Sequence, residues 1–295
     1  MEGELFAALY PLVLEEARRR PRVARVQFSD AAILLVMIHA ALHDRPVCWA
    51  CQQRNWSREY DGLALPSPAT VSRRIRRLSF WLLMAAVFAR YQQVRLYPSL
   101  GPHPLVRRAD SKPLIVGGFS KDRDARRGYA TGGIARGYKL CHLWGNSVVP
   151  ELLLLAPLNL DDAKGLAQML PQIQGQGYLL ADSLHDHNDL HATARRRGLQ
   201  LLAPRKKPGT GLAHRRHDPG RLRAIDLLEG PNAFGSSVYG LREQIERDLG
   251  GLCGFAGGLQ PLPSWVRGPR RVTLWTVLKL LINAARICQN HRLTA

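Results

Sequence analysis

The sequence predicts an α/β fold, a mixed sheet flanked by helices, that is preceded by a small all-helical N-terminal domain. Three observations predict this fold. Residues 1–100 carry helical apolar patterns, prolines and a glycine interrupt the pattern at 98–104, and apolar segments of strand length then alternate with helical ones. The chain has 295 residues, which suits one large domain or a medium domain with a smaller companion. We therefore expect domains at 1–100 and 101–295.

Two helices are expected in the N-terminal domain. Ser29 and Asp30 can cap the first, whose apolar residues follow from Ala31 onward and must be buried. Ser67 can cap the second, and Pro68 then occupies the first helical position, where a missing N–H costs nothing.

The second helix has the composition of a DNA-reading element. Val71, Ile75 and Leu78 form one apolar stripe at helical spacing. The rest of its surface is polar or basic: Thr70, Ser72, Arg73, Arg74, Arg76 and Arg77. An apolar back with a Ser/Thr/Arg front suits a helix that enters the major groove, so the segment predicts a helix-turn-helix. A solvated basic helix face is the alternative.

Charge points in the same direction. Lys and Arg number 42 against 23 Asp and Glu, a net charge of +19, which favours a polyanionic partner such as nucleic acid or an anionic membrane surface. The longest apolar runs are too short to span a bilayer, so no membrane association is expected. Cys48 and Cys51 form one CxxC motif without a second pair, so neither zinc nor a disulfide framework is expected. These features predict a soluble, cytoplasmic protein.

From residue 105 the pattern predicts three strands, a helix, a strand, a helix and a strand. The expected strands cover 105–110, 137–144, 148–156, 177–182 and 199–203, and the expected helices cover 161–170 and 187–197. A basic loop or insert is expected at about 204–235, and helices at 238–249 and 272–287.

Two carboxylates stand at the ends of apolar strands in this domain. Asp110 and Asp182 would emerge at one edge of the sheet if their strands lie side by side in parallel. Two such anions repel unless a cation lies between them. Mg²⁺ prefers a carboxylate pair with phosphate oxygens, and two ions can clamp both oxygens of a phosphoryl displacement.

The third acid is sought on a helix. Tyr239, Arg242, Glu243 and Glu246 share one helix face, and Arg242 beside Glu246 can hold that carboxylate and contact a phosphate. Glu243 is the rival for the third acid. Asp186 is the rival for the second, although it does not end an apolar strand.

Three motifs carry a resemblance to a known family. They are Ala-Asp-Ser-Lys-Pro-Leu at 109–114, Leu-Ala-Asp-Ser at 180–183 and Tyr-Gly-Leu-Arg-Glu-Gln-Ile-Glu-Arg at 239–247. In this order they resemble the DDE transposases of bacterial insertion sequences, and the third matches that group's Tyr-x2-Arg-x3-Glu signature. The resemblance covers residues 104–290 and implies a ribonuclease-H-like catalytic domain.

The resemblance implies roles for individual residues. Asp110, Asp182 and Glu246 would be the catalytic acids and would bind two Mg²⁺ ions, with Mn²⁺ able to substitute. Tyr239, Arg242 and Arg247 would contact DNA phosphate. The partners would be the double-stranded terminal inverted repeats and target DNA, bound by a homodimer in the bacterial nucleoid. The basic helix (Arg73, Arg74, Arg76, Arg77) and the insert (Lys206, Lys207) would bind DNA as well.

Two alternatives stay open. The first is a ribonuclease-H-like nuclease that cuts DNA without strand transfer. The second is a helix-turn-helix DNA-binding protein without catalytic activity, which Cys253 keeps open because the transposase signature has a basic residue there.

Overall fold

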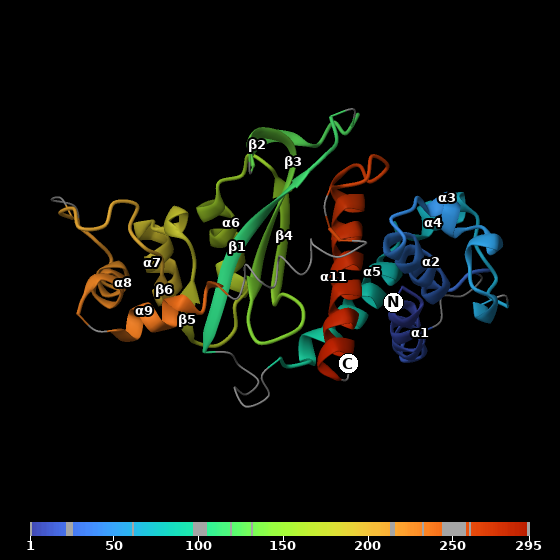
Figure 1. Ribbon diagram of the computed structural model, residues 1–295, viewed down its shortest axis with the longest axis horizontal. Helices are drawn as coiled ribbons and strands as arrows, with labels where there is room; N and C mark the ends of the chain where they lie inside the picture. The colour runs from blue at the N-terminus through green and yellow to red at the C-terminus, as the bar shows by residue number, and fades with distance from the viewer. Residues whose placement is uncertain are drawn as a thin grey trace. The chain divides into compact units, whose positions relative to one another are not determined.

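The computed structural model describes residues 2–21, 26–60, 62–96, 105–118, 120–130, 132–212, 216–231, 233–243, 258–259 and 261–293. The chain divides into two compact units. The helical unit comprises 1–94, 252–259 and 270–295, and the sheet unit comprises 95–251 and 260–269. Figure 1 labels their elements.

Six α-helices of the described residues form the helical unit: α1 (Glu2–Arg18), α2 (Asp30–Leu42), α3 (Val47–Ala50), α4 (Pro68–Arg74), α5 (Leu78–Gln93) and α11 (Pro269–His291). Short 3-10 turns cover Gln53–Asn55 and Arg58–Tyr60. The predicted caps are confirmed, because the Ser29 hydroxyl accepts from the Ala32 amide and the Ser67 hydroxyl accepts from the Thr70 amide. Helix α2 is buried along almost its whole length, as its apolar sequence predicts.

The C-terminal helix packs in the helical unit, whereas it was expected in the second domain. The Lys279 ammonium, fully buried, donates to Asp44 over 2.6 Å, and the Arg270 guanidinium lies 5.6 Å from the centre of the Trp81 ring. Helix α11 buries residues around most of its circumference, so it needs neighbours on several sides. Helices supply such surroundings.

The predicted DNA-reading segment forms two helices rather than one. Ile75 closes α4, and Arg77 is extended and precedes α5. This break shifts the helical phase, so Leu78 is 72% exposed, whereas Val71 and Ile75 are buried as predicted. Residues 51–67 separate α3 from α4 and include the two 3-10 turns. Helix α4 is therefore not preceded by the short turn of a helix-turn-helix.

The described residues of the sheet unit form six strands: β1 (Val106–Ile115), β2 (Arg126–Ala130), β3 (Gly133–Trp144), β4 (Leu152–Pro157), β5 (Gly177–Leu180) and β6 (Leu199–Leu202). Their order is β2-β3-β1-β5-β6, and β4 also pairs with β3. The β1–β3, β2–β3 and β3–β4 pairs are antiparallel, whereas β1–β5 and β5–β6 are parallel. The predicted mixed α/β sheet is confirmed.

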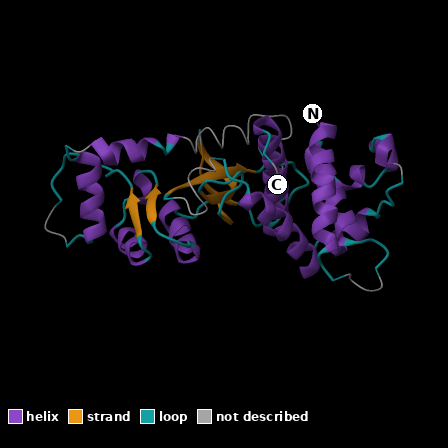
Figure 2. Cartoon of the chain, turned by 90° about the horizontal axis from the view of Figure 1, so that it is seen from below, coloured by secondary structure: helices purple, strands orange, loops and turns teal. Residues whose placement is uncertain are grey.

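In the described part of this unit, four α-helices pack against the sheet: α6 (Asp162–Met169), α7 (Asn188–Arg196), α8 (Pro219–Glu229) and α9 (Ala233–Gly240). Figure 2 colours helices and strands separately. Side chains of α6 and α7 form one core with alternate residues of β1, β3, β5 and β6. Side chains of α8 and α9 pack on Leu180 and Leu202, which point to the other face.

The sheet unit departs from the sequence prediction in several places. Helix α9 covers 233–240 instead of the predicted 238–249, of which 244–249 lie outside the described residues. Strand β1 continues past Asp110 to Ile115, because β3 supplies antiparallel partners along its whole second half. Strand β2, which was not predicted, pairs with the first residues of β3. The predicted basic insert at 204–235 is mostly ordered, since α8 and the start of α9 lie within it.

Candidate active site

Asp110 and Asp182 lie side by side on one face of the sheet. The parallel pair β1–β5 aligns Arg108 with Leu180, and each aspartate lies two residues further along its own segment. Because side chains alternate between faces, Asp182 points to the same face as Leu180, the face that α9 covers. The expected parallel pairing of the two strands is therefore present, although Asp110 stands within its strand rather than at the end.

The pKa of the Asp110 carboxyl is raised. Burial is the main cause, and the nearby negative charge of Asp182 acts in the same direction. The Ser111 amide, which donates to Asp110 Oδ1 over 2.8 Å, and the Arg242 guanidinium oppose the shift. Asp110 thus favours either a proton or a neighbouring cation.

The pKa of the Asp182 carboxyl is lowered instead. Burial would raise it, but hydrogen bonds and positive charge outweigh that effect. The His185 ring nitrogen Nδ1 lies 2.6 Å from Asp182 Oδ1, and the Leu184 amide donates to the same oxygen over 3.0 Å. These contacts hold one carboxylate oxygen and orient the other, Oδ2. Asp182 therefore stays an anion under most conditions.

Helix α9 brings the predicted Tyr-x2-Arg motif to the two aspartates. The Tyr239 hydroxyl donates to the Ala181 carbonyl over 3.2 Å, and the Arg242 amide donates to the Tyr239 carbonyl over 2.9 Å in the turn that follows the helix. Arg242 Nη2 lies 3.9 Å from Asp110 Oδ2. Tyr239 therefore fixes the turn against the end of β5, and Arg242 reaches across to β1.

Glu246, Arg247 and Cys253 lie outside the described residues, so the third predicted acid stays a prediction. Glu243, its rival, is described and exposed. Among the described residues there is no group of three His, Cys, Asp or Glu side chains that can hold a metal ion.

Asp186, the rival for the second acid, belongs to a separate ion-pair network. Its two carboxylate oxygens accept from Arg221 Nε over 2.7 Å and from Arg221 Nη2 over 2.6 Å. His191 Nε2 lies 3.3 Å away. The pKa of Asp186 is strongly lowered, since these partners outweigh its burial. Both oxygens are engaged, so Asp182 is the better metal ligand.

Two histidines that were not among the predicted site residues lie next to the aspartates. His185 is buried and forms a hydrogen bond with the Asp182 carboxylate. Its position three residues after a strand-end aspartate is the sequence feature that could have identified it. His142 lies directly opposite Asp110 in the β1–β3 pair. Burial, together with the charge of Lys112, lowers the pKa of His142 to about 3, so its imidazole is neutral at physiological pH.

The predicted DNA-binding cations differ in accessibility. Arg73, Arg76 and Arg77 are exposed, as are Lys206 and Lys207. Arg74 is buried, and its guanidinium lies 2.5 Å from Asp30 Oδ1. Arg74 is buried on the apolar side of α4 and pairs with Asp30. The prediction that Arg74 contacts DNA is therefore replaced by a structural role.

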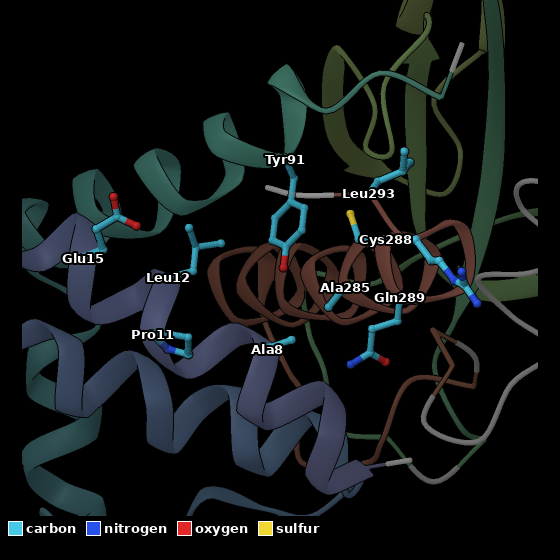
Figure 3. Close-up of a pocket in the computed structure, with 10 residues that line it drawn as sticks. Ala8, Pro11, Leu12, Glu15, Tyr91, Ala285, Cys288, Gln289 and Leu293 are labelled. Carbon is cyan, nitrogen blue, oxygen red and sulfur yellow. The ribbon is translucent and has the colours of Figure 1, made fainter. Parts of the chain in front are cut away.

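The helical unit contains a pocket of about 470 Å³ that lies between α1, α5 and α11 (Figure 3). Its lining includes Tyr91 and Cys288. Burial raises the pKa of both, that of Cys288 to about 11, so neither side chain loses its proton near neutral pH. The pocket is a gap between packed helices.

In the described part of the chain, no helix combines the length and the apolar character needed to cross a bilayer. Comparison with protein-family models finds no match. Comparisons with curated proteins and with solved structures find no significant match either.

Proposed function

We propose that the protein is a metal-dependent enzyme that cleaves DNA at transposon ends and joins them to target DNA, with Asp110 and Asp182 as its central acids. The observation that carries this proposal is the alignment of these two carboxylates on adjacent parallel strands, with Arg242 3.9 Å from Asp110. Active sites of α/β sheets collect where such strands present polar side chains.

The strand arrangement supports a ribonuclease-H-like fold for the sheet unit. Three antiparallel strands, β1, β3 and β4, precede two parallel ones, β5 and β6, with α6 and α7 between them in the chain. This is the alternation that the resemblance to DDE transposases implies. Here Asp110 lies on β1, and Asp182 follows the parallel neighbour β5 by two residues.

The chemistry of the two carboxylates fits Mg²⁺ or Mn²⁺. Burial and Asp182 together disfavour the anionic form of Asp110, and a divalent cation between the carboxylates would offset that repulsion. Asp182 would bind through Oδ2, because Oδ1 already accepts two hydrogen bonds. Glu246 would complete the ligand set. When bound, two such ions lower the pKa of a bound water and stabilise charge on the phosphoryl oxygens.

The protein groups around the aspartates would position the DNA. Arg242 would bind a phosphate oxygen close to the bond that breaks. His185 would hold the carboxylate plane of Asp182, and Tyr239 would hold the turn that carries Arg242. In cleavage, water oxygen bonds to phosphorus as the bond to the 3′ oxygen breaks. In transfer, the freed 3′ hydroxyl oxygen bonds to a phosphorus of the target DNA as the bond from that phosphorus to the target 3′ oxygen breaks, and the released target 3′ oxygen takes up the proton.

The exposed cations would bind the rest of the substrate. Arg73, Arg76 and Arg77 would contact the terminal repeat, and Lys206 and Lys207 would contact backbone phosphates. Two transposon ends must be held together, so we expect a homodimer on DNA.

The test is a cleavage and joining assay on duplexes that carry the inverted repeats flanking the gene. We expect Asp110→Asn and Asp182→Asn each to lower Mg²⁺-dependent cleavage by at least about 100-fold while DNA binding persists. Asp189→Asn, which removes an exposed acid from α7, is the matched control and should keep full activity. Cleavage by Asp110→Asn at the wild-type rate would overturn the proposal.

A DNA-binding protein without catalysis is the second candidate. It is favoured by the position of Arg242, whose guanidinium can itself compensate the Asp110 charge. Titration with Mn²⁺ separates the two: an enzyme should bind the ion, and a binding protein should not. Cleavage without joined products would instead identify a nuclease.

A further inference from the structure

The β2–β3 hairpin presents two large apolar side chains to solvent. Tyr129 is 83% exposed and Ile134 is 71% exposed. They are direct cross-strand partners, so their side chains project from the same face of the hairpin. The residues of β3 that precede residue 137 pair with β2 and not with β1. Tyr129 and Ile134 therefore lie on a two-stranded extension at one end of the sheet (Figure 1).

The opposite face of this hairpin carries mostly small residues, and close backbone approaches occur there at Gly128 and Gly137. Gly128, Ala130, Gly133, Ala135 and Gly137 alternate with the exposed pair. A Cβ atom on Gly128 would lie 2.5 Å from the Leu158 carbonyl oxygen, so only glycine permits this approach. The hairpin therefore packs against Leu158 through Gly128, and the Tyr129–Ile134 face stays outward.

Arginines flank the apolar pair on that outward face. Arg127 and Arg136 are direct cross-strand partners, two residues from Tyr129 and Ile134 respectively. Like charges in this relation destabilise a hairpin unless an anion lies between them. The Arg136 guanidinium donates to the carbonyls of Ser120, Asp122 and Ala125, which are neutral acceptors.

Further positive charge surrounds the hairpin. Lys121, Arg123 and Arg126 are exposed on β2 and on the segment that leads into it. An aromatic ring and an aliphatic side chain between arginines match a nucleic acid chemically, because the arginines can bind phosphates while the apolar pair contacts bases.

The hairpin face is also the face of the two aspartates. Side chains at even-numbered positions of β3 lie on one face, and these include Ile134, Arg136 and His142. His142 is the cross-strand partner of Asp110. The rise of a strand puts Ile134 roughly 26 Å along β3 from the level of Asp110. At about 3.4 Å per base pair, this distance corresponds to roughly eight base pairs of duplex.

We infer that the hairpin is a DNA wedge. Tyr129 stacks on a base of a distorted step roughly eight base pairs from the cleaved phosphate, Ile134 fills the space beside it, and Arg127 holds the neighbouring phosphate. The inference rests on the proposed function only in taking DNA as the partner. It assigns the hairpin the task of recognising unpaired or deformable DNA.

The test measures binding without divalent ions to two fluorescein-labelled duplexes of about 40 base pairs, one fully paired and one with a central mismatch bubble. We expect the full chain to prefer the bubble by about 5- to 100-fold, the range that one stacked base provides. Tyr129→Phe should keep this preference. Tyr129→Ala should lose it and still bind the paired duplex.

Charge variants supply a second measurement. Arg127→Gln should reduce the slope of log affinity against log salt by about 0.9 on both duplexes. Arg196→Gln, an exposed arginine on α7 at the opposite sheet face, is the matched control and should leave slope and preference unchanged.

Two results would overturn the wedge: Tyr129→Ala retaining the bubble preference, or Tyr129→Ala converting a dimer to a monomer in solution, which would make the hairpin a protein interface. Failure of the wedge is distinct from failure of the proposed function. Asp110→Asn tests cleavage in Mg²⁺, whereas the wedge is tested by binding alone.

Discussion

The substitution Asp186→Asn tests whether Asp186 has a structural role that Asp182 does not have, because the two aspartates should contribute differently to the free energy of unfolding. The substitution removes the charge that accepts two hydrogen bonds from Arg221 and lies 3.3 Å from His191. The Asp186 side chain is only 5% exposed and that of Arg221 16% exposed. The variant thus leaves a largely buried guanidinium without its counter-charge.

Breaking a buried ion pair by removing one partner costs about 3–5 kcal/mol, and partial exposure of Arg221 reduces this to about 2–4 kcal/mol. The pKa of Asp186 is lowered by folding, so its contribution is present above the unfolded pKa of about 3.9 and is lost as pH falls further. The difference between variant and wild type should therefore shrink below about pH 4.

The assay is urea unfolding followed by far-ultraviolet circular dichroism at pH 7 and at pH 3. Asp182→Asn, which lies four residues earlier and is more exposed, should lower the free energy of unfolding by less than about 1 kcal/mol. Equal destabilisation by the two variants at pH 7 would refute the assignment of Asp186 to structure and Asp182 to the site.

Three further predictions concern other parts of the chain. Gly137→Ala should destabilise the sheet unit by about 1–3 kcal/mol in thermal unfolding, because its Cβ would lie 2.1 Å from the Leu114 carbonyl oxygen, whereas Gly240→Ala meets open space and should be nearly neutral. Because burial lowers the pKa of His142 to about 3, stability should be complete above about pH 6.5 and decline as pH falls towards the folded pKa; His142→Leu should flatten this dependence, and an unchanged slope would contradict it. Arg73→Gln should lower DNA affinity without changing stability, while Arg74→Gln should cost about 3–5 kcal/mol because it leaves Asp30 without its buried partner; the reverse pattern in binding and unfolding assays would exclude the placement of α4.

The sequence predicted the elements of the sheet unit well where apolar pattern and capping agree. Helix α6 lies within the predicted range 161–170, and the strands that end near Asp182 and Leu202 are confirmed. Strand β2 escaped prediction because its sequence, Arg-Arg-Gly-Tyr-Ala, has no buried apolar alternation. It forms through backbone pairing with β3, which local pattern does not show.

The site was predictable as far as topology follows from the order of elements. Parallel neighbours bring Asp110 and Asp182 together, and that relation came from strand-end positions alone. The partners of charged groups were not predictable, because they depend on contacts between distant segments. Arg74 meets Asp30 and Asp186 meets Arg221 through tertiary packing, which turned one expected DNA contact and one rival acid into structural ion pairs.

The measurement that tests the central claim most directly is localised backbone cleavage by Fe²⁺ bound in place of Mg²⁺, with ascorbate and peroxide and with the fragments sized by mass spectrometry. The account predicts cuts in β1 around Asp110 and just after β5 around Asp182, both abolished in Asp110→Asn. Cuts elsewhere in the chain, or the same cuts in Asp110→Asn, would contradict a shared ion between the two aspartates.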